Sequence, residues 1–265
     1  MIEAFAHHQR TRGFSAQTVR RRTNTLHSFE RFLAPANLGD ATLAHIEEWL
    51  STKPAARTRH AYRSDLRVFY AWAVKRNLLD TNPAALTDSI KVPKALPRPI
   101  GSEVHTALFV GSQRARRMVA LELFAGLRSS EVAVLDCSDI GHGVIVVRDG
   151  KGGKDRVIPM HPVLAEMLDG IPGSGRLFTR AGRPISSSAV ARVIAHQFER
   201  CGISATPHQL RHTFGTELAR ATNGNLVAMA DLMGHSSTET TRGYTGWAAN
   251  MSETIASMYD GGDAA

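Results

Sequence analysis

A set of basic and aromatic residues in the sequence could bind and cleave a phosphodiester. Arginine guanidinium groups bind phosphate oxygens through paired hydrogen bonds, and a tyrosine hydroxyl can attack phosphorus to form a covalent intermediate. Histidine and lysine can transfer the protons that such a reaction needs. This combination predicts phosphodiester chemistry without a metal ion. The candidate catalytic residues are Arg128, Lys151, His208, Arg211, His235 and Tyr244.

Two of these residues lie at the predicted start of a helix. Thr206 is suited to the N-cap, Pro207 to the first helical position, and Gln209 completes a Thr-x-x-Gln capping box. His208 and Arg211 are three residues apart and therefore share one face of this helix near its N-terminus. The exposed N–H groups at that end favour a bound phosphate.

Two further candidates are expected at junctions between elements. Gly126 and Leu127 end a predicted helix that starts near residue 114, so Arg128 lies in the joint before a helix over 130–135 that Ser129 caps. Rigid elements on both sides would orient its side chain. Lys151 is on a tight glycine turn between predicted strands at 143–148 and 156–160. A solvated turn lysine is the alternative interpretation for Lys151.

The positive charge is concentrated in the first part of the chain. Residues 1–100 contain 16 Lys and Arg against 8 Asp and Glu, whereas residues 101–265 contain 16 against 16. This asymmetry favours a nucleic-acid-binding first part attached to a domain with another task, although a solvated basic surface would have the same composition. The candidate DNA-binding residues are Arg20, Arg21, Arg59, Arg63, Arg67, Lys91 and Lys94.

Periodicity predicts a mostly α-helical, two-domain fold with one small β-hairpin. Residues 1–87 are expected to form a helical domain, residues 88–101 a basic, proline-rich linker, and residues 102–265 the second domain with its C-terminal tail. The helices expected in the first domain start at Ser15, at Asp40, near Pro54 and at Asn82-Pro83.

Five sequence motifs, in order, resemble those of the tyrosine recombinases, the phage-integrase and Xer family. The first domain is similar to the helical core-binding domain of that family. Each motif alone would be weak, but their order is specific. The motifs are A-G-L-R-S-S-E-V (125–132), G-K-G-G-K-D-R (150–156), H-Q-L-R-H-T-F (208–214), L-M-G-H-S-S (232–237) and T-T-R-G-Y-T (240–245).

The resemblance implies a role for each candidate residue. Tyr244 would be the nucleophile that forms a 3′-phosphotyrosyl bond, and Lys151 would protonate the 5′ leaving oxygen. Arg128 and Arg211 would hold the non-bridging phosphate oxygens. His208 would assist proton transfer and His235 would hydrogen-bond the phosphate. Glu131 and His212 match supporting positions.

The resemblance also implies the partners and the reaction class. It implies a site-specific recombinase, with a phage or mobile-element integrase first and a Xer-type chromosome-dimer resolvase second, acting on double-stranded DNA as a homotetramer on two sites. A directionality or accessory DNA-bending factor is left open. A type IB topoisomerase shares this chemistry but would act as a monomer, and a silent DNA-binding regulator would need the six residues to be coincidental. The tail over 251–259, with Ile255 and Met258, would dock on a neighbouring protomer or pack on its own chain.

Other function classes are disfavoured by the sequence. His208 and His212 have helical spacing but lack the glutamate of a zinc H-E-x-x-H motif, and there is no P-loop, so we expect no metal, ATP or other cofactor. Cys137 and Cys201 follow no metal or redox spacing and are interpreted as core thiols. No apolar run approaches the roughly 20 residues of a membrane span. A cytoplasmic, nucleoid-associated protein is expected.

Overall fold

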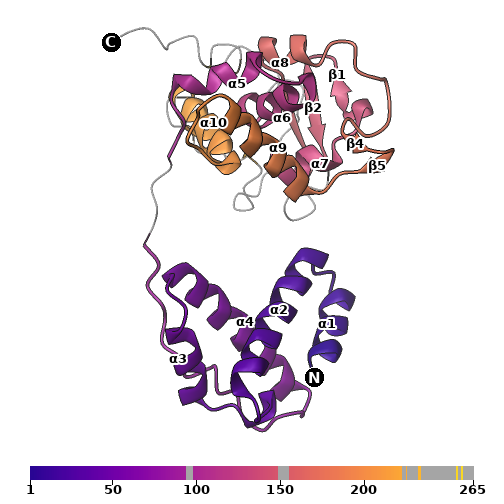
Figure 1. Cartoon of the computed structure of the whole chain (residues 1–265). Helices are drawn as coiled ribbons and strands as arrows, with labels where there is room; N and C mark the ends of the chain where they lie inside the picture. Colours follow the sequence, from indigo (N-terminus) through magenta and orange to yellow (C-terminus); the bar gives the residue numbers. More distant parts are fainter. Residues whose placement is uncertain are drawn as a thin grey trace. The chain divides into compact units, whose positions relative to one another are not determined.

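The chain consists of two units, Met1–Ala95 and Leu96–Ala265, in a computed structural model. The structure describes residues 1–93, 98–148, 155–222, 225, 232, 233, 255 and 258. The division between the units falls within the predicted linker. Figure 1 shows a helical first unit and a second unit in which the small sheet lies at one side of a group of helices.

Four α-helices make up the described part of the first unit (Figure 1). Ser15 caps the second helix as predicted, because its hydroxyl accepts the backbone N–H of Thr18 at 3.2 Å. The helix at the N-terminus was not foreseen, since it precedes the first capping signal in the sequence. The helices are α1 (Ile2–Thr11), α2 (Ala16–Leu33), α3 (Leu43–Ser51) and α4 (Ala56–Lys75), with a 3₁₀ turn at Leu38–Asp40.

An aromatic core holds the first unit together. Phe5 from α1 and Phe69 from α4 meet edge to face, with ring centroids 5.4 Å apart, a geometry that aromatic pairs prefer. Tyr70 is fully buried and its hydroxyl donates to the carbonyl of Leu38 at 2.9 Å. Trp49 on α3 stacks on Tyr62. The large buried side chains of these helices therefore pack against one another.

The helix predicted at Asn82-Pro83 is wrong, because this segment is a turn. Asn82 does cap it, since its side-chain oxygen accepts the N–H of Ala85 at 3.0 Å. The carbonyls of Ala85 and Thr87, however, accept hydrogen bonds from the guanidinium groups of Arg67 and Arg63. Side chains thus take acceptors that a continuing helix would use.

The second unit contains six α-helices and two small antiparallel sheets among the described residues. Its three-stranded sheet has the order β1-β2-β3, and Val144–Val147 pairs in register with Pro159–Arg156. The helices are α5 (Thr106–Phe109), α6 (Gln113–Phe124), α7 (Ser129–Val134), α8 (Pro162–Met167), α9 (Ser187–Arg200) and α10 (Pro207–Ala221). The strands are β1 (Ile140–Gly141), β2 (Val144–Val147), β3 (Arg156–Pro159), β4 (Thr179–Arg180) and β5 (Arg183–Pro184).

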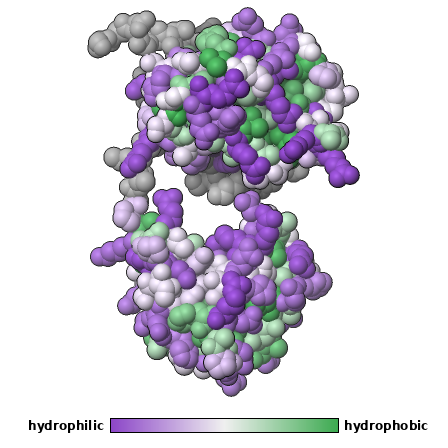
Figure 2. Space-filling view, in the orientation of Figure 1, coloured by the Kyte–Doolittle hydropathy of each residue, from purple (hydrophilic) through white to green (hydrophobic). Residues whose placement is uncertain are grey.

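A buried core between α6, α9 and α10 fixes the elements that carry the candidate residues. α10 starts as predicted, with Thr206 as N-cap and its N–H donating to the Gln209 side chain at 2.8 Å. Phe214 on α10 is fully buried and packs against the end of α6. Hydrophilic residues cover most of the face shown in Figure 2, where hydrophobic residues form only small groups.

Residues 98–100 of the linker are hydrogen-bonded to α10. The backbone N–H of Ile100 donates to the buried Thr213 hydroxyl at 2.9 Å, and the Gln209 side chain donates to the carbonyl of Arg98 at 3.2 Å. The end of the linker is therefore part of the second unit and is attached to α10.

Two residues of the C-terminal tail pack in the core of their own chain. Ile255 is fully buried and Met258 nearly so. The His161 ring accepts the N–H of Val163 through Nδ1, so its Nε2 carries the proton and donates to the carbonyl of Met258 at 3.1 Å. Of the two predicted alternatives for the tail, the single chain therefore shows these two residues packed on their own chain, whose core supplies the apolar surface that they contact.

Replacement of Gly126 by alanine should destabilise the second unit. Gly126 has φ +58°, and a Cβ there would lie 2.3 Å from a ring carbon of Phe214. Overpacking and left-handed strain together should cost about 2–4 kcal/mol of unfolding free energy. Denaturant unfolding measures this loss, with Gly173→Ala as the control because a Cβ at Gly173 meets nothing within 4 Å. Equal midpoints for the two variants would contradict the packing argument.

Candidate active site

Arg128 lies in the joint between α6 and α7, as predicted, but the joint is capped differently. Arg128 itself is the N-cap of α7, and its backbone N–H donates to Oε2 of Glu131 at 2.8 Å. Oε1 of the same carboxylate accepts from the Arg128 guanidinium at 2.7 Å. Ser129, which was predicted to be the cap, is instead the first residue of the helix. The Glu131 carboxylate accepts the backbone N–H of the actual cap residue, Arg128.

Arg211 reaches the same joint from α10. It is 5% exposed, and its guanidinium donates to the carbonyls of Gly126 and Met233. Burial, followed by the positive charge of Arg128, lowers the pKa of Arg211 to about 10, so the group is still protonated at neutral pH. Arg128 also donates to the Met233 carbonyl, at 3.5 Å. The structure therefore brings both arginines within reach of one oxygen atom.

A buried ion pair with Arg156 supports this arrangement. The Arg156 guanidinium donates to both oxygens of Glu131, at 2.9 and 2.7 Å, and to the carbonyl of Leu232 at 3.0 Å. Burial alone would raise the pKa of Glu131, but the hydrogen bonds and charges of Arg156 and Arg128 outweigh it and lower the pKa to about 2. Glu131 is thus ionised and joins two arginines, whereas sequence reasoning had given no role to Arg156. A basic residue among the apolar residues of β3 was the available signal.

His208 lies one turn before Arg211 on α10. Its ring meets that of His212 at a centroid distance of 4.5 Å. Partial burial, then the charges of His212, Arg211 and Arg128, lower the pKa of His208. The lowered pKa favours the neutral imidazole, which can accept a proton. The described candidates His208, Arg211 and Arg128 belong to one electrostatic cluster.

Three predicted catalytic residues, Lys151, His235 and Tyr244, lie outside the described residues. The same is true of the predicted DNA-binding residue Lys94. In the part of the chain that the structure describes, no three His, Cys, Asp or Glu side chains are grouped as metal ligands.

The predicted DNA-binding arginines of the first unit differ in their surroundings. Arg20 and Lys91 are exposed. Arg21 is ion-paired at 2.7 Å with the buried Asp65. Arg63 donates three hydrogen bonds to Thr87, two of them to its carbonyl. The other two predicted arginines of α4 also donate to carbonyls. Arg59 binds the carbonyls of Lys53 and Pro54, and Arg67 binds that of Ala85.

The spacing of Arg59, Arg63 and Arg67 therefore has a structural component. Like charges at this spacing repel in an isolated helix, and the DNA that these arginines were predicted to bind is a polyanion that would offset the repulsion. Backbone carbonyls supply part of that compensation within the chain itself, although each guanidinium has further donors.

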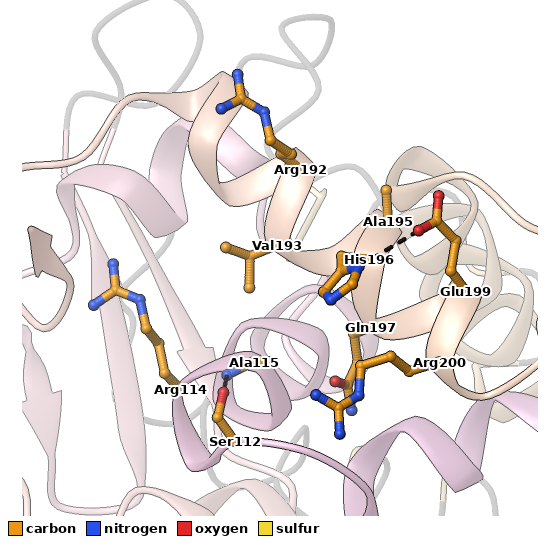
Figure 3. Close-up of a pocket in the computed structure, with 10 residues that line it drawn as sticks. All are labelled: Ser112, Arg114, Ala115, Arg192, Val193, Ala195, His196, Gln197, Glu199 and Arg200. Atoms are coloured by element: carbon orange, nitrogen blue, oxygen red, sulfur yellow. Dashed lines mark hydrogen bonds and ion pairs between the residues drawn. The ribbon is translucent and has the colours of Figure 1, made fainter.

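A separate cavity of about 530 Å³ lies between the N-terminal end of α6 and the C-terminal half of α9. Figure 3 shows that the guanidinium groups of Arg114, Arg192 and Arg200 point in different directions around it. Arg114 is engaged by the carbonyl of Thr179 at 2.8 Å. The arginines at this cavity thus do not converge on one anion, in contrast to Arg128 and Arg211 at the opposite end of α6.

The chain matches two family descriptions that together cover most of its length. Residues 103–251 match the phage integrase family and residues 2–77 the phage integrase N-terminal SAM-like domain. The protein therefore belongs to the phage integrase family and is a tyrosine recombinase, with the mostly helical, two-part fold of that family.

Relatives and solved structures agree with this assignment. The chain is 34% identical to tyrosine recombinase XerC of Rhodospirillum centenum, over 88% of this chain and 78% of the relative. It is 31% identical to XerC of Myxococcus xanthus, over 92% of each. Among structures, lambda integrase (75–356), solved as a dimer bound to a COC′ core site, superposes with a TM-score of 0.73 at 21% identity, covering 92% of this chain and 97% of that one. The integrase of mycobacterium phage Brujita superposes with a TM-score of 0.55 at 26% identity, covering 97% of this chain and 92% of that one.

In the part of the chain that the structure describes, no helix combines the length and the apolar character that a membrane span requires.

Glu131→Gln should destabilise the second unit most at neutral pH. The pKa of Glu131 falls from 4.5 to about 2 on folding, which corresponds to about 3 kcal/mol of stability. This contribution is complete above pH 4.5 and is lost as the pH falls toward 2. The difference in unfolding free energy between wild type and variant should therefore be large at pH 7 and shrink at pH 3. A difference that does not depend on pH would contradict the ion-pair assignment.

Arg20→Ala and Arg63→Ala should separate DNA binding from stability. Arg63 carries charged hydrogen bonds to Thr87, so its loss should cost about 1–3 kcal/mol of unfolding free energy. Arg20 is exposed, and its loss should leave stability within about 0.5 kcal/mol. It should reduce the slope of log affinity for duplex DNA against log salt by about 1. An unchanged salt slope for Arg20→Ala would mean that Arg20 does not contact DNA phosphates.

Proposed function

We propose that this protein is a site-specific DNA recombinase that cuts and rejoins DNA through a 3′-phosphotyrosyl intermediate at Tyr244, without metal or ATP. The observation that supports this most directly is the convergence of Arg128 and Arg211 on the Met233 carbonyl. Two guanidinium groups that meet at one acceptor suit a phosphate, whose two non-bridging oxygens require several donors. In this proposal the scissile phosphate lies beside both groups.

The chemistry follows from the charges of this cluster. The Tyr244 oxygen attacks phosphorus and the bond from phosphorus to the 5′ oxygen breaks. Arg128 and Arg211 stabilise the negative charge that develops on the non-bridging oxygens. A tyrosine with a pKa near 10 is only about 0.1% ionised at neutral pH, so neutral His208 accepts its proton. Lys151 donates a proton to the 5′ oxygen, and His235 hydrogen-bonds the phosphate.

Rejoining is the reverse reaction with a different 5′ hydroxyl. The phosphotyrosyl bond keeps the energy of the broken diester, so neither ATP nor a second high-energy bond is required. Lys151 then accepts the proton of the attacking hydroxyl and Tyr244 recovers its own. The same residues therefore serve both directions.

We infer double-stranded DNA as the partner and a homotetramer on two sites as the active assembly. Lambda integrase has been solved as a tetramer bound to a Holliday junction, and its chain superposes on this one with a TM-score of 0.72 at 22% identity over 91% of this chain and 78% of that one. In the first unit, exposed Arg20 and Lys91 are available to phosphates. The proposed location is the cytoplasm, in association with the nucleoid.

Two biological roles fit this activity. Integration of a phage or mobile element is supported by the likeness to the Brujita integrase. Resolution of chromosome dimers is supported by the XerC relatives, which align over most of their length. Recombination between two identical sites on one circle, compared with recombination between two different sites on separate molecules, distinguishes these roles.

Tyr244→Phe should abolish covalent adduct formation and leave DNA binding intact. The readout is a protein–DNA adduct on a denaturing gel, formed on nicked duplexes drawn from a random-sequence pool, which trap the intermediate because the small 5′ fragment is lost. Wild-type adduct should form equally with and without EDTA. Tyr70→Phe is unsuitable as the control because Tyr70 is buried; Tyr62→Phe, at a half-buried core position of the first unit, is the matched substitution.

Two outcomes would defeat this proposal. A covalent adduct formed by Tyr244→Phe would mean that another residue is the nucleophile. Strong loss of wild-type cleavage in EDTA would mean that the reaction uses a metal ion.

A further inference from the structure

Glu122 is a buried acid beside the arginine cluster that the proposed reaction does not use. It lies on α6, one turn before the joint that carries Arg128, and is 2% exposed. Its Oε1 accepts a hydrogen bond from the Ser129 hydroxyl at 2.6 Å. Ser129 directly follows Arg128 and is the first residue of α7. This hydrogen bond therefore connects the two helices across the joint.

Besides the contacts of Glu131 with Arg128, three further contacts hold the joint. Phe214 fills the space above Gly126, and Arg211 binds the carbonyl of Gly126. The Glu122–Ser129 hydrogen bond is the third contact. Each contact limits the positions that the backbone of Arg128 can take, because one residue separates Arg128 from Gly126 and none separates it from Ser129.

We propose that Glu122, acting through its hydrogen bond with Ser129, is a positioning residue that orients Arg128 toward the scissile phosphate. The inference rests on the proposed function. When Glu122 is uncharged, the positive charges of Arg128 and Arg211 remain available to the phosphate. An ionised Glu122 would compete with the phosphate for Arg211.

The surroundings of Glu122 favour the uncharged form. Burial raises the pKa of Glu122 to about 8, and the charge of Glu131 on α7 acts in the same direction. The Ser129 hydrogen bond and the charge of Arg211 on α10 oppose this effect. Arg156 on β3 reaches the cluster through Glu131. On the neighbouring helices, His161 at the start of α8 stacks on Phe124, and α9 carries Arg192, His196, Glu199 and Arg200 at the cavity beside the other end of α6.

The expected pH dependence follows from the sign of this shift. As the pH rises through about 8, Glu122 loses its proton and places a negative charge beside Arg211. Cleavage by the wild type should therefore slow between pH 7 and pH 9. A negative charge added beside Arg211 corresponds to a loss of about five- to tenfold in rate.

The test measures single-turnover cleavage of the nicked substrate from pH 6 to 9 for the full-length protein. Glu122→Gln has nearly the same shape but cannot ionise, so the ratio of its rates at pH 7 and pH 9 should be nearer to one than that of the wild type. Ser129→Ala removes the donor and should lower the maximal rate about tenfold without changing DNA affinity. Ser129→Thr restores a hydroxyl and should recover most of the rate. Ser130→Ala, at an exposed position of the same helical turn, is the control.

The outcomes separate this inference from the proposed function. Absence of any wild-type adduct would defeat the proposed function itself. A wild type that forms the adduct, with Glu122→Gln showing the same pH profile and Ser129→Ala the same rate as Ser130→Ala, would overturn only the role of Glu122. If Glu122→Gln does not fold, as judged by circular dichroism, the comparison of Ser129→Ala, Ser129→Thr and Ser130→Ala decides the question.

Discussion

The arrangement of the second unit depends on one carboxylate that binds two arginines. Glu131 accepts hydrogen bonds from the guanidinium groups of Arg128 and Arg156 and from the backbone N–H of Arg128. A buried ion of this kind is stable only when its partners are well placed and its remaining lone pairs are occupied. Its geometry therefore fixes three elements at once: the start of α7, the start of β3 and the joint after α6.

The same network explains why the arginines lie close together despite their mutual repulsion. Arg128 and Arg211 share the Met233 carbonyl, and Arg156 binds the neighbouring carbonyl of Leu232. Three positive charges are thus only partly offset by one ionised carboxylate and by carbonyl dipoles. The net positive charge that is left is the property a phosphate-binding site requires, because the ligand completes the balance.

The sequence predicted the elements whose signals are local. The capping box at Thr206 and the cap at Ser15 are present, since a cap needs only residues within one turn. The helices predicted to start at Ser15 and near Pro54 are also present, as α2 and α4. The joint at Arg128 was foreseen, but not the exchange of partners in which Glu131 satisfies the cap and Ser129 binds Glu122.

The interactions that sequence reasoning missed connect residues that are distant in the chain. Arg156 and Glu131 are separated by 25 positions, and Arg63 and Thr87 by 24. No periodicity in the sequence encodes such a pairing. The helix predicted at Asn82-Pro83 fails for the same reason, because Arg63 and Arg67 donate hydrogen bonds to carbonyls that a helix would use. Motif resemblance supplied the candidate catalytic residues of the second unit, whereas the ion pairs around Arg128 are seen only in three dimensions.

The hydrogen bonds from the linker to α10 have a mechanical consequence. Thr213 and Gln209 are one turn apart and bracket Arg211, and each is fastened to the segment over 98–100. The helix cannot turn about its axis without breaking both attachments. Tension applied along the linker is therefore delivered to the first two turns of α10, the same turns from which His208 and Arg211 project.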